Sequence, residues 1–255
     1  MGGRGASSGA MNAIAGMRSN QSIHILSYRF SDAKSGLEYL KNKYGWNYDD
    51  KMTQMDFRAV SAIANAADVI YNEFPNFDMV KAVKEMPALY ADAPAGALAN
   101  GELYYNVDKH YNDWDTYSRE YALNVAIGYR PRGTTAEHDT IHELAHMLTY
   151  QVARRMYQND SDYVAAINRG EPSGIIAIAA LASHGQNNLR GMLDNNYSVE
   201  DDIKGISEYA FKSYKRGGRI YNEVVAEAVA DYVANRNLAN PLSKEIWNQL
   251  KKQLR

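Results

Sequence analysis

The sequence predicts an α+β protein that is mostly helical and carries a small sheet. Three segments, residues 57–70, 134–152 and 221–232, repeat apolar side chains at helical spacing. Two segments between the first and second of these, residues 80–86 and 97–107, are rich in β-branched and aromatic residues and are bounded by Gly, Pro or Asn, which is typical of strands. With 255 residues and 45% hydrophobic composition, the chain can bury a substantial core.

The N-terminal sequence predicts a flexible leader followed by a helical extension of the domain. Residues 1–20 begin with a Gly/Ser-rich stretch that lacks the apolar core of a signal peptide, so we expect a flexible leader on a protein that is cytoplasmic as synthesised. The rest of the chain, residues 21–255, is expected to form a single domain. Within it, residues 22–29 favour a short strand, and residues 31–43 favour a helix that ends near Gly45.

The next helical segments have recognisable start signals. A capping box from Thr53 to Asp56 is expected to begin the helix at 57–70, and Pro75 to stop it. A second box, from Thr134 to Glu137, is expected to begin the helix at 134–152.

The helix at 134–152 contains the motif His142-Glu143-Leu144-Ala145-His146. Residues four apart lie on one face of a helix, so both imidazoles can bind one zinc ion while Glu143 reaches a water on the metal. His138 lies one turn before His142 on the same helix face. Three ligands from one straight helix would fit tetrahedral zinc poorly, so we expect His138 to form hydrogen bonds at the start of the helix instead.

A third protein ligand is needed, because catalytic zinc sites usually have three and leave one position open. The helix at 221–232 places Glu223 and Glu227 on one face among Val and Ala residues, which indicates burial. Buried carboxylates are rare unless they are paired or bind a metal. Glu208 and Asp231 lie in the same region and are the competing acids.

These motifs resemble those of a known family. His-Glu-Leu-Ala-His at 142–146 and Asn-Glu-Val-Val-Ala-Glu at 222–227 are similar to the paired motifs of the gluzincin branch of the zincin metallopeptidases. Residues 206–210 resemble segments of anthrax lethal factor-like domains and of metallopeptidase domains associated with phage heads and toxins. The resemblance covers about residues 97–235 and implies a zincin-like fold with a small mixed sheet and an HExxH helix.

By position, the resemblance implies a role for each site residue. Glu223 would be the third zinc ligand, Glu227 would accept the second N–H of a ligand histidine, and Glu143 would be the general base. Tyr209 would stabilise the oxyanion.

The chain departs from compact members of the family in two places. More residues separate His146 from Glu223, with the extra length expected at 160–196. More residues also separate the 206–210 segment from Glu223, which leaves Tyr214 and Tyr221 as alternatives to Tyr209.

Composition excludes several other classes of protein. A net charge of −2 and a pI near 6.3 give no basic surface for nucleic acid. The absence of cysteine excludes thiolate ligands and disulfides. The apolar run at 174–182 is shorter than the roughly 20 residues of a membrane span, so a buried helix or a lid is expected there.

The sequence therefore predicts a zinc-dependent endopeptidase that acts on a protein or peptide substrate. A second hypothesis is a structural or adaptor module of a phage particle or delivered toxin, in which zinc only stabilises the fold. A third is a delivered toxin domain that cleaves one host protein. Glu143 favours catalysis, because a structural zinc site has no need of a base.

Overall fold

A computed structural model of the chain describes residues 28–90, 92–187, 198–217 and 220–255. In these ranges the protein is mostly helical and contains a mixed four-stranded sheet, which confirms the α+β class. The expected leader at 1–20, most of the expected strand at 22–29, and the end of the expected insertion at 160–196 lie outside the described residues. Residues 28 and 29 are not in a strand.

The sheet has the strand order β1-β2-β4-β3. The strands β1 (Asn47–Tyr48), β2 (Ala82–Glu85) and β4 (Glu102–Tyr105) are parallel, and β3 (Ala95–Leu98) runs antiparallel to β4 at one edge. The prediction of one strand at 97–107 was wrong, because β3 and β4 form a hairpin here. Gly101, with φ 94°, makes its turn in a conformation that favours glycine.

Two helices pack together on the N-terminal side of the molecule: α2 (Ala33–Tyr44) and α3 (Phe57–Glu73). The capping box from Thr53 was wrong, because Thr53 belongs to the 3₁₀ helix η1 (Asp50–Gln54). Asp56 caps α3 itself by accepting a hydrogen bond from the backbone N–H of Arg58.

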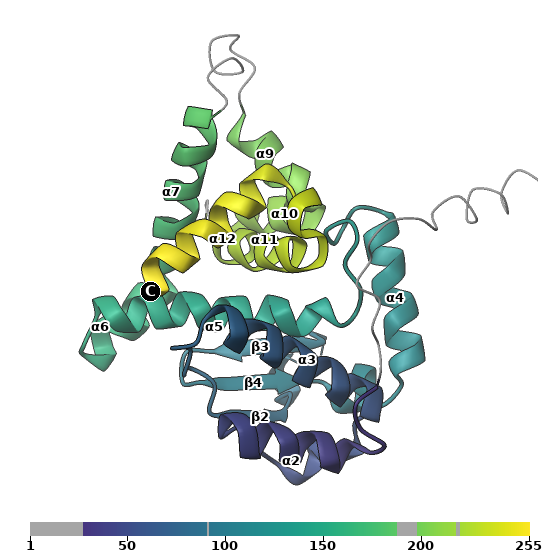
Figure 1. Ribbon diagram of the computed structural model, residues 1–255. Helices are drawn as coiled ribbons and strands as arrows, with labels where there is room; N and C mark the ends of the chain where they lie inside the picture. Colours follow the sequence, from purple (N-terminus) through teal and green to yellow (C-terminus); the bar gives the residue numbers. More distant parts are fainter. Residues whose placement is uncertain (1–27, 91, 188–197, 218–219) are drawn as a thin grey trace, which may run out of the picture.

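The central element is α5 (His138–Met156), which is buried along most of its length. It separates the layer of the sheet, α2 and α3 from the C-terminal helices (Figure 1). The capping box at Thr134 was also wrong. The Thr134 hydroxyl donates to the carbonyl of Pro131, and α5 begins three residues later than a Thr134 cap would place it, with no side-chain cap at Glu137.

The remaining described elements are all helices. They are η2 (Ala88–Tyr90), η3 (Val107–Tyr111), α4 (Trp114–Ala126), α6 (Asp160–Asn168), α7 (Glu171–Asn187), α9 (Val199–Ile206), α10 (Glu208–Arg216), α11 (Asn222–Asn235), η4 (Arg236–Leu238) and α12 (Pro241–Leu254). The apolar run at 174–182 lies within α7, where Ile176, Ala177 and Ala180 are buried and Ile178 is exposed, so a partly buried helix is confirmed. Among the described helices, none is long and apolar enough to cross a membrane.

The main hydrophobic core joins both ends of the described chain. Ala33 in α2 and Leu254 in α12 belong to the same buried cluster, which also includes Leu144 and Leu148 of α5. Because α5 lies inside this core, its polar residues are held in fixed positions, and their placement determines the candidate site.

Candidate metal centre

His142, His146 and Glu223 converge where α5 meets α11. The Nε2 atom of His142 lies 3.0 Å from Oε2 of Glu223, and Nε2 of His146 lies 3.7 Å from Oε1 of Glu223. One ligand atom from each of the three residues lies within 4.8 Å of the others. The structure thus brings together the three residues that the sequence predicts as metal ligands.

Packing between α5 and α11 produces this convergence. The inner face of α11 is formed by short side chains, including Val224, Ala228 and Val229, all of which are buried. Short side chains at a contact allow two helices to approach closely. The first turn of α11 therefore lies beside the middle of α5, and Glu223 reaches the two histidines.

The three side chains fit a zinc ion. Ligands at 2.0–2.2 Å in tetrahedral geometry are separated by about 3.3 Å, close to the separations found here. The Oε2 atom of Glu223 is buried and has no hydrogen-bond partner among the described residues, although it faces His142. Two imidazoles and a carboxylate without any thiolate match the donor types that zinc accepts in catalytic sites.

The charge around the group also fits a cation. Burial alone would lower the pKa of His142, but Glu223 and Glu227 outweigh burial and raise this pKa well above its usual value. Burial would likewise raise the pKa of Glu223, and the two histidines instead bring it well below its usual range. A positive charge is therefore favoured between these side chains.

Glu143 lies between the two histidines in sequence and is 7% exposed. Burial raises the pKa of its carboxyl group, and the positive charges of His142 and His146 act in the opposite direction. Burial beside two histidines is compatible with the predicted role of general base, which accepts a proton from water.

Behind His142 lies Glu227, as the sequence predicts. Its Oε1 atom is 2.9 Å from Nδ1 of His142, although the N–H direction at Nδ1 is not aligned for a hydrogen bond in this structure. Ser207 donates a hydrogen bond of 2.8 Å to Oε2, and Arg130 donates one of 2.6 Å to Oε1. Glu227 is 1% exposed, so these partners compensate a fully buried charge.

Arg130 links Glu227 to a second buried acid, Asp139. The distance from Nη2 of Arg130 to Oδ1 of Asp139 is 3.5 Å. Tyr111 and Tyr117 each donate a hydrogen bond of 2.7 Å to Oδ2 of Asp139. The histidines are thus bordered by a network of buried, mutually satisfied polar groups.

Tyr209 lies beside His142, and its two rivals, Tyr214 and Tyr221, pack against each other. The ring centroid of Tyr209 is 6.1 Å from that of His142. The pKa of Tyr209 is raised by burial first and then by Glu223, which is consistent with this position. Tyr214 is buried and packs against Tyr221, with ring centroids 5.1 Å apart. The ring of Tyr209 therefore lies close to one of the predicted metal ligands.

The other candidates lie outside the metal group. His138 accepts a hydrogen bond from the backbone N–H of Thr135 at the start of α5, as predicted. Asp231 accepts hydrogen bonds from the side chain of Asn235 and the backbone of Asn240. Glu208 lies in the first turn of α10 and pairs with Lys212.

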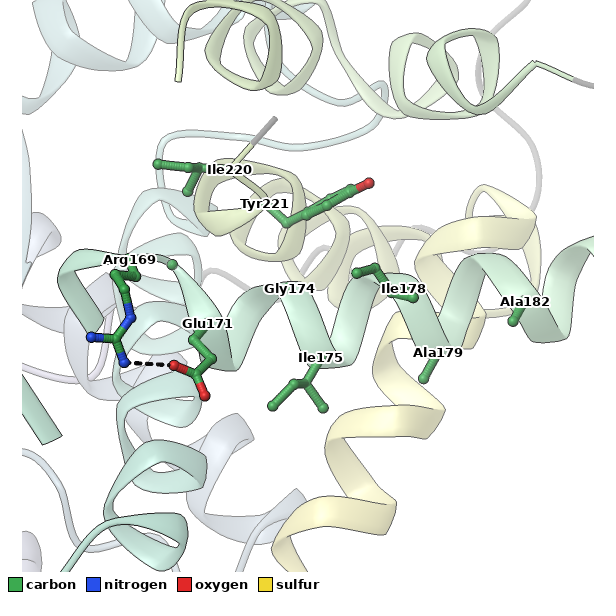
Figure 2. A pocket seen from close by; sticks show the side chains of 10 residues that line it. Arg169, Glu171, Gly174, Ile175, Ile178, Ala179, Ala182, Ile220 and Tyr221 are labelled. Carbon is green, nitrogen blue, oxygen red and sulfur yellow. Dashed lines mark hydrogen bonds and ion pairs between the residues drawn. The ribbon is translucent and has the colours of Figure 1, made fainter. Parts of the chain in front are cut away.

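A pocket of about 750 Å³ opens between α7 and the start of α11. Figure 2 shows Ile175, Ile178 and small residues of α7 on one side, and Ile220 and Tyr221 on the other. The ion pair of Arg169 and Glu171 lies at one end. None of the lining residues belongs to the metal group, so this pocket is a separate apolar surface near the start of α11.

Sequence reasoning missed Arg130, Ser207 and Asp139. Arg130 precedes a proline, which is typical of a turn, and it is 97 positions away from Glu227. Ser207 belongs to the 206–210 segment but was given no role. Asp139 lies one turn before His142 and Glu143 on α5, so helical spacing was the one local signal for it.

Comparisons of the chain with models of protein families, with curated proteins and with solved structures found no match. The geometry of the metal group therefore carries the functional interpretation.

Proposed function

We propose that the protein is a zinc-dependent endopeptidase of the zincin type. The observation that carries this proposal is the convergence of His142, His146 and Glu223, with Glu143 buried beside them. The mixed sheet with an antiparallel edge strand, lying next to the HExxH helix, supports the same interpretation. The resemblance of the two sequence motifs to gluzincins, which involves the same residues, is a further support.

His142, His146 and Glu223 would hold the zinc ion and leave a coordination position for water or substrate. Zinc bound there would supply Lewis-acid chemistry, lowering the pKa of a water molecule and polarising the peptide carbonyl. Glu227 would fix the orientation of the His142 ring by accepting its second N–H.

Glu143 would take a proton from the attacking water and pass it to the nitrogen of the departing amine. Tyr209 would donate a hydrogen bond to the carbonyl oxygen as negative charge develops on it. The expected products are two peptides, one with a new carboxylate and one with a new amino group.

Metal binding is the first test. The purified protein is dialysed without chelator, and its zinc content is measured by elemental analysis. We expect about one zinc per chain, because the group provides one set of three protein ligands. A chain that contains no zinc and takes up none on titration would contradict the proposal.

Glu143→Gln tests catalysis separately from metal binding. The amide preserves the shape of the side chain but accepts no proton, so zinc content and folding should be unchanged. Hydrolysis of a denatured protein substrate is measured by mass spectrometry of the products. We expect its rate to fall by about 10²–10⁴-fold. Equal cleavage by parent and variant would exclude Glu143 as the base.

The second candidate function is a structural or adaptor module with a stabilising zinc. The burial of His142 and His146 favours it, since a buried site that joins two helices would also stabilise the fold. Zinc binding without cleavage of any denatured protein would support this alternative.

A further inference from the structure

Arg130 lies in the loop between α4 and α5, and any role for it in metal binding rests on the proposed zinc site. Its side chain is 13% exposed, and its guanidinium contacts Glu227 at 2.6 Å and Asp139 at 3.5 Å. The same guanidinium lies 4.8 Å from the ring centroid of Tyr209 and 5.6 Å from that of Tyr121. A buried arginine with two acids and two aromatic rings around it is held in one orientation.

The backbone around Arg130 is fixed together with the segment that contains Tyr209. The N–H of Glu208 donates to the carbonyl of Gly128, and the N–H of Tyr209 donates to the carbonyl of Tyr129. Gly128, with φ 76°, provides the turn after α4 that this pairing requires. Arg130 and Tyr209 therefore have fixed positions relative to each other as well as to α5.

Arg130 and Ser207 hold the two carboxylate oxygens of Glu227 in place. A buried carboxylate that loses one of its partners turns toward the polar groups that remain. The hydrogen bond from Ser207 reaches Oε2, whereas Arg130 reaches Oε1, which is the oxygen that faces Nδ1 of His142. Removing Arg130 would leave the oxygen that faces His142 without its charged partner.

We propose that Arg130 is a positioning residue that holds Oε1 of Glu227 beside Nδ1 of His142, and that it thereby increases the affinity of the His142, His146 and Glu223 group for zinc. Tyr209 and Asp139 hold the guanidinium in place for this role. Arg130 contacts none of the three metal ligands in the structure, so it acts through Glu227.

Two roles for Arg130 predict opposite effects of its removal. A cation near the site repels a second cation, so a purely electrostatic role predicts that Arg130→Met binds zinc more tightly. A positioning role predicts weaker binding, because loss of the partner that orients a ligand histidine usually costs about 10–100-fold in metal affinity. The sign of the change therefore discriminates between the roles.

The test is a competitive zinc titration of the full-length protein against a chromophoric chelator at fixed pH. The variants are Arg130→Met, Glu227→Gln and the double variant, with Arg132→Met as a control in the same loop because Arg132 is exposed. Circular dichroism and thermal unfolding of the metal-free proteins report on folding. We expect Arg130→Met to bind zinc about 10–100-fold more weakly, and Arg132→Met to bind as the parent does.

The double variant shows whether Arg130 acts through Glu227. If it does, the double variant binds zinc no more weakly than Glu227→Gln alone, because the carboxylate that Arg130 holds is already absent. Two results would overturn the inference. One is a double variant whose loss of zinc affinity equals the product of the two single losses. The other is an Arg130→Met variant that binds zinc as tightly as the parent or more tightly. If Arg130→Met does not fold, Arg130→Lys in the same cycle gives the same comparison with a smaller expected loss.

The outcomes also separate this inference from the proposed function. A parent protein that binds no zinc would contradict both the proposed function and the role of Arg130. A parent that binds zinc beside an Arg130→Met variant of equal affinity would remove only the role of Arg130.

Discussion

At the residue scale, the two acids of α11 near the histidines, Glu223 and Glu227, are distinguished by their partners. Glu223 faces Nε2 of both histidines, while Glu227 lies behind His142 and is held by Arg130 and Ser207. A ligand contributes a bond to the metal itself, whereas a residue behind a ligand contributes only orientation and charge. The acids are therefore expected to differ strongly in their effect on zinc binding.

We expect Glu223→Ala to lose zinc binding and Glu227→Ala to weaken it by about 10–100-fold. Glu208→Ala is the matched control, because Glu208 pairs with Lys212 and not with the histidines. This variant should bind zinc as tightly as the parent does. The measurement is a competitive zinc titration of the three variants. If Glu227→Ala bound no zinc while Glu223→Ala still did, the two assignments would be reversed.

At the element scale, the contact between α2 and α3 depends on a glycine. A Cβ atom at Gly36 would lie 2.5 Å from Cγ1 of Val60 and 2.9 Å from Cδ2 of Phe30. Val60 is fully buried in the core, so it has no free space into which it could move. Gly174, in the interior of α7, has no such neighbour within 4 Å.

Alanine at these two positions should therefore have opposite effects on the free energy of unfolding. We expect Gly36→Ala to destabilise the protein by about 1–3 kcal/mol through overpacking. Gly174→Ala should stabilise it by up to about 1 kcal/mol, because alanine favours the helix and meets no clash. Denaturant unfolding of both variants checks this, and a neutral or stabilising Gly36→Ala would contradict the packing at the contact between α2 and α3.

The same pair of helices is joined by a charge cluster around Asp68. Burial would raise the pKa of Asp68, but hydrogen bonds from Lys43, Tyr44, Tyr39 and Arg29 outweigh it and lower this pKa to about 2. The group is partly exposed, so solvent reduces the energy involved. Because the folded-state pKa lies below the ordinary value of 3.8, the stabilisation is complete above pH 4 and is lost as the pH falls toward 2.

Asp68→Asn tests this dependence on pH in the metal-free protein. The variant should be less stable than the parent near neutral pH, and the difference should shrink as the pH falls from about 4 to 2, because the unfolded parent takes up a proton at Asp68 near pH 3.8 and the folded parent only near pH 2. Urea unfolding at several pH values measures the difference. A difference that stays constant over this range would show that the charge of Asp68 contributes nothing.

At the scale of the whole molecule, the candidate metal group joins the central helix α5 to the C-terminal helix α11, two helices that lie next to each other in Figure 1. Its histidines are on α5, and Glu223 is on α11, one of the C-terminal helices. The core that joins α2 to α12 is large enough for the protein to fold without metal. Zinc is therefore expected to add stability to a protein that is already folded.

We expect added zinc to raise the melting temperature. At a free zinc concentration of 100 times Kd, the gain is about 2.7 kcal/mol. For a chain of this size, this corresponds to about 5–10 °C. Thermal unfolding with zinc and with excess chelator measures the shift, and Glu223→Ala should show none. A parent whose melting temperature does not respond to zinc would contradict specific binding to the folded state.

The sequence by itself determined the local parts of the candidate site. The helical period places His142 and His146 one turn apart, and the run of Val and Ala around Glu223 and Glu227 predicted a buried helix, which the structure confirms. Such patterns depend on neighbours within a few positions, so they can be read along the chain. The capping boxes at Thr53 and Thr134 were wrong, because a local turn and a nearby carbonyl occupied these side chains instead.

Only the tertiary structure decided which distant groups meet. It placed Tyr209 next to His142, with Tyr214 and Tyr221 packed against each other, and it brought Arg130 to Glu227. A buried charge needs a partner, but nothing along the chain specifies which of many possible partners reaches it, because this depends on how α4, α5, α10 and α11 pack around the common core.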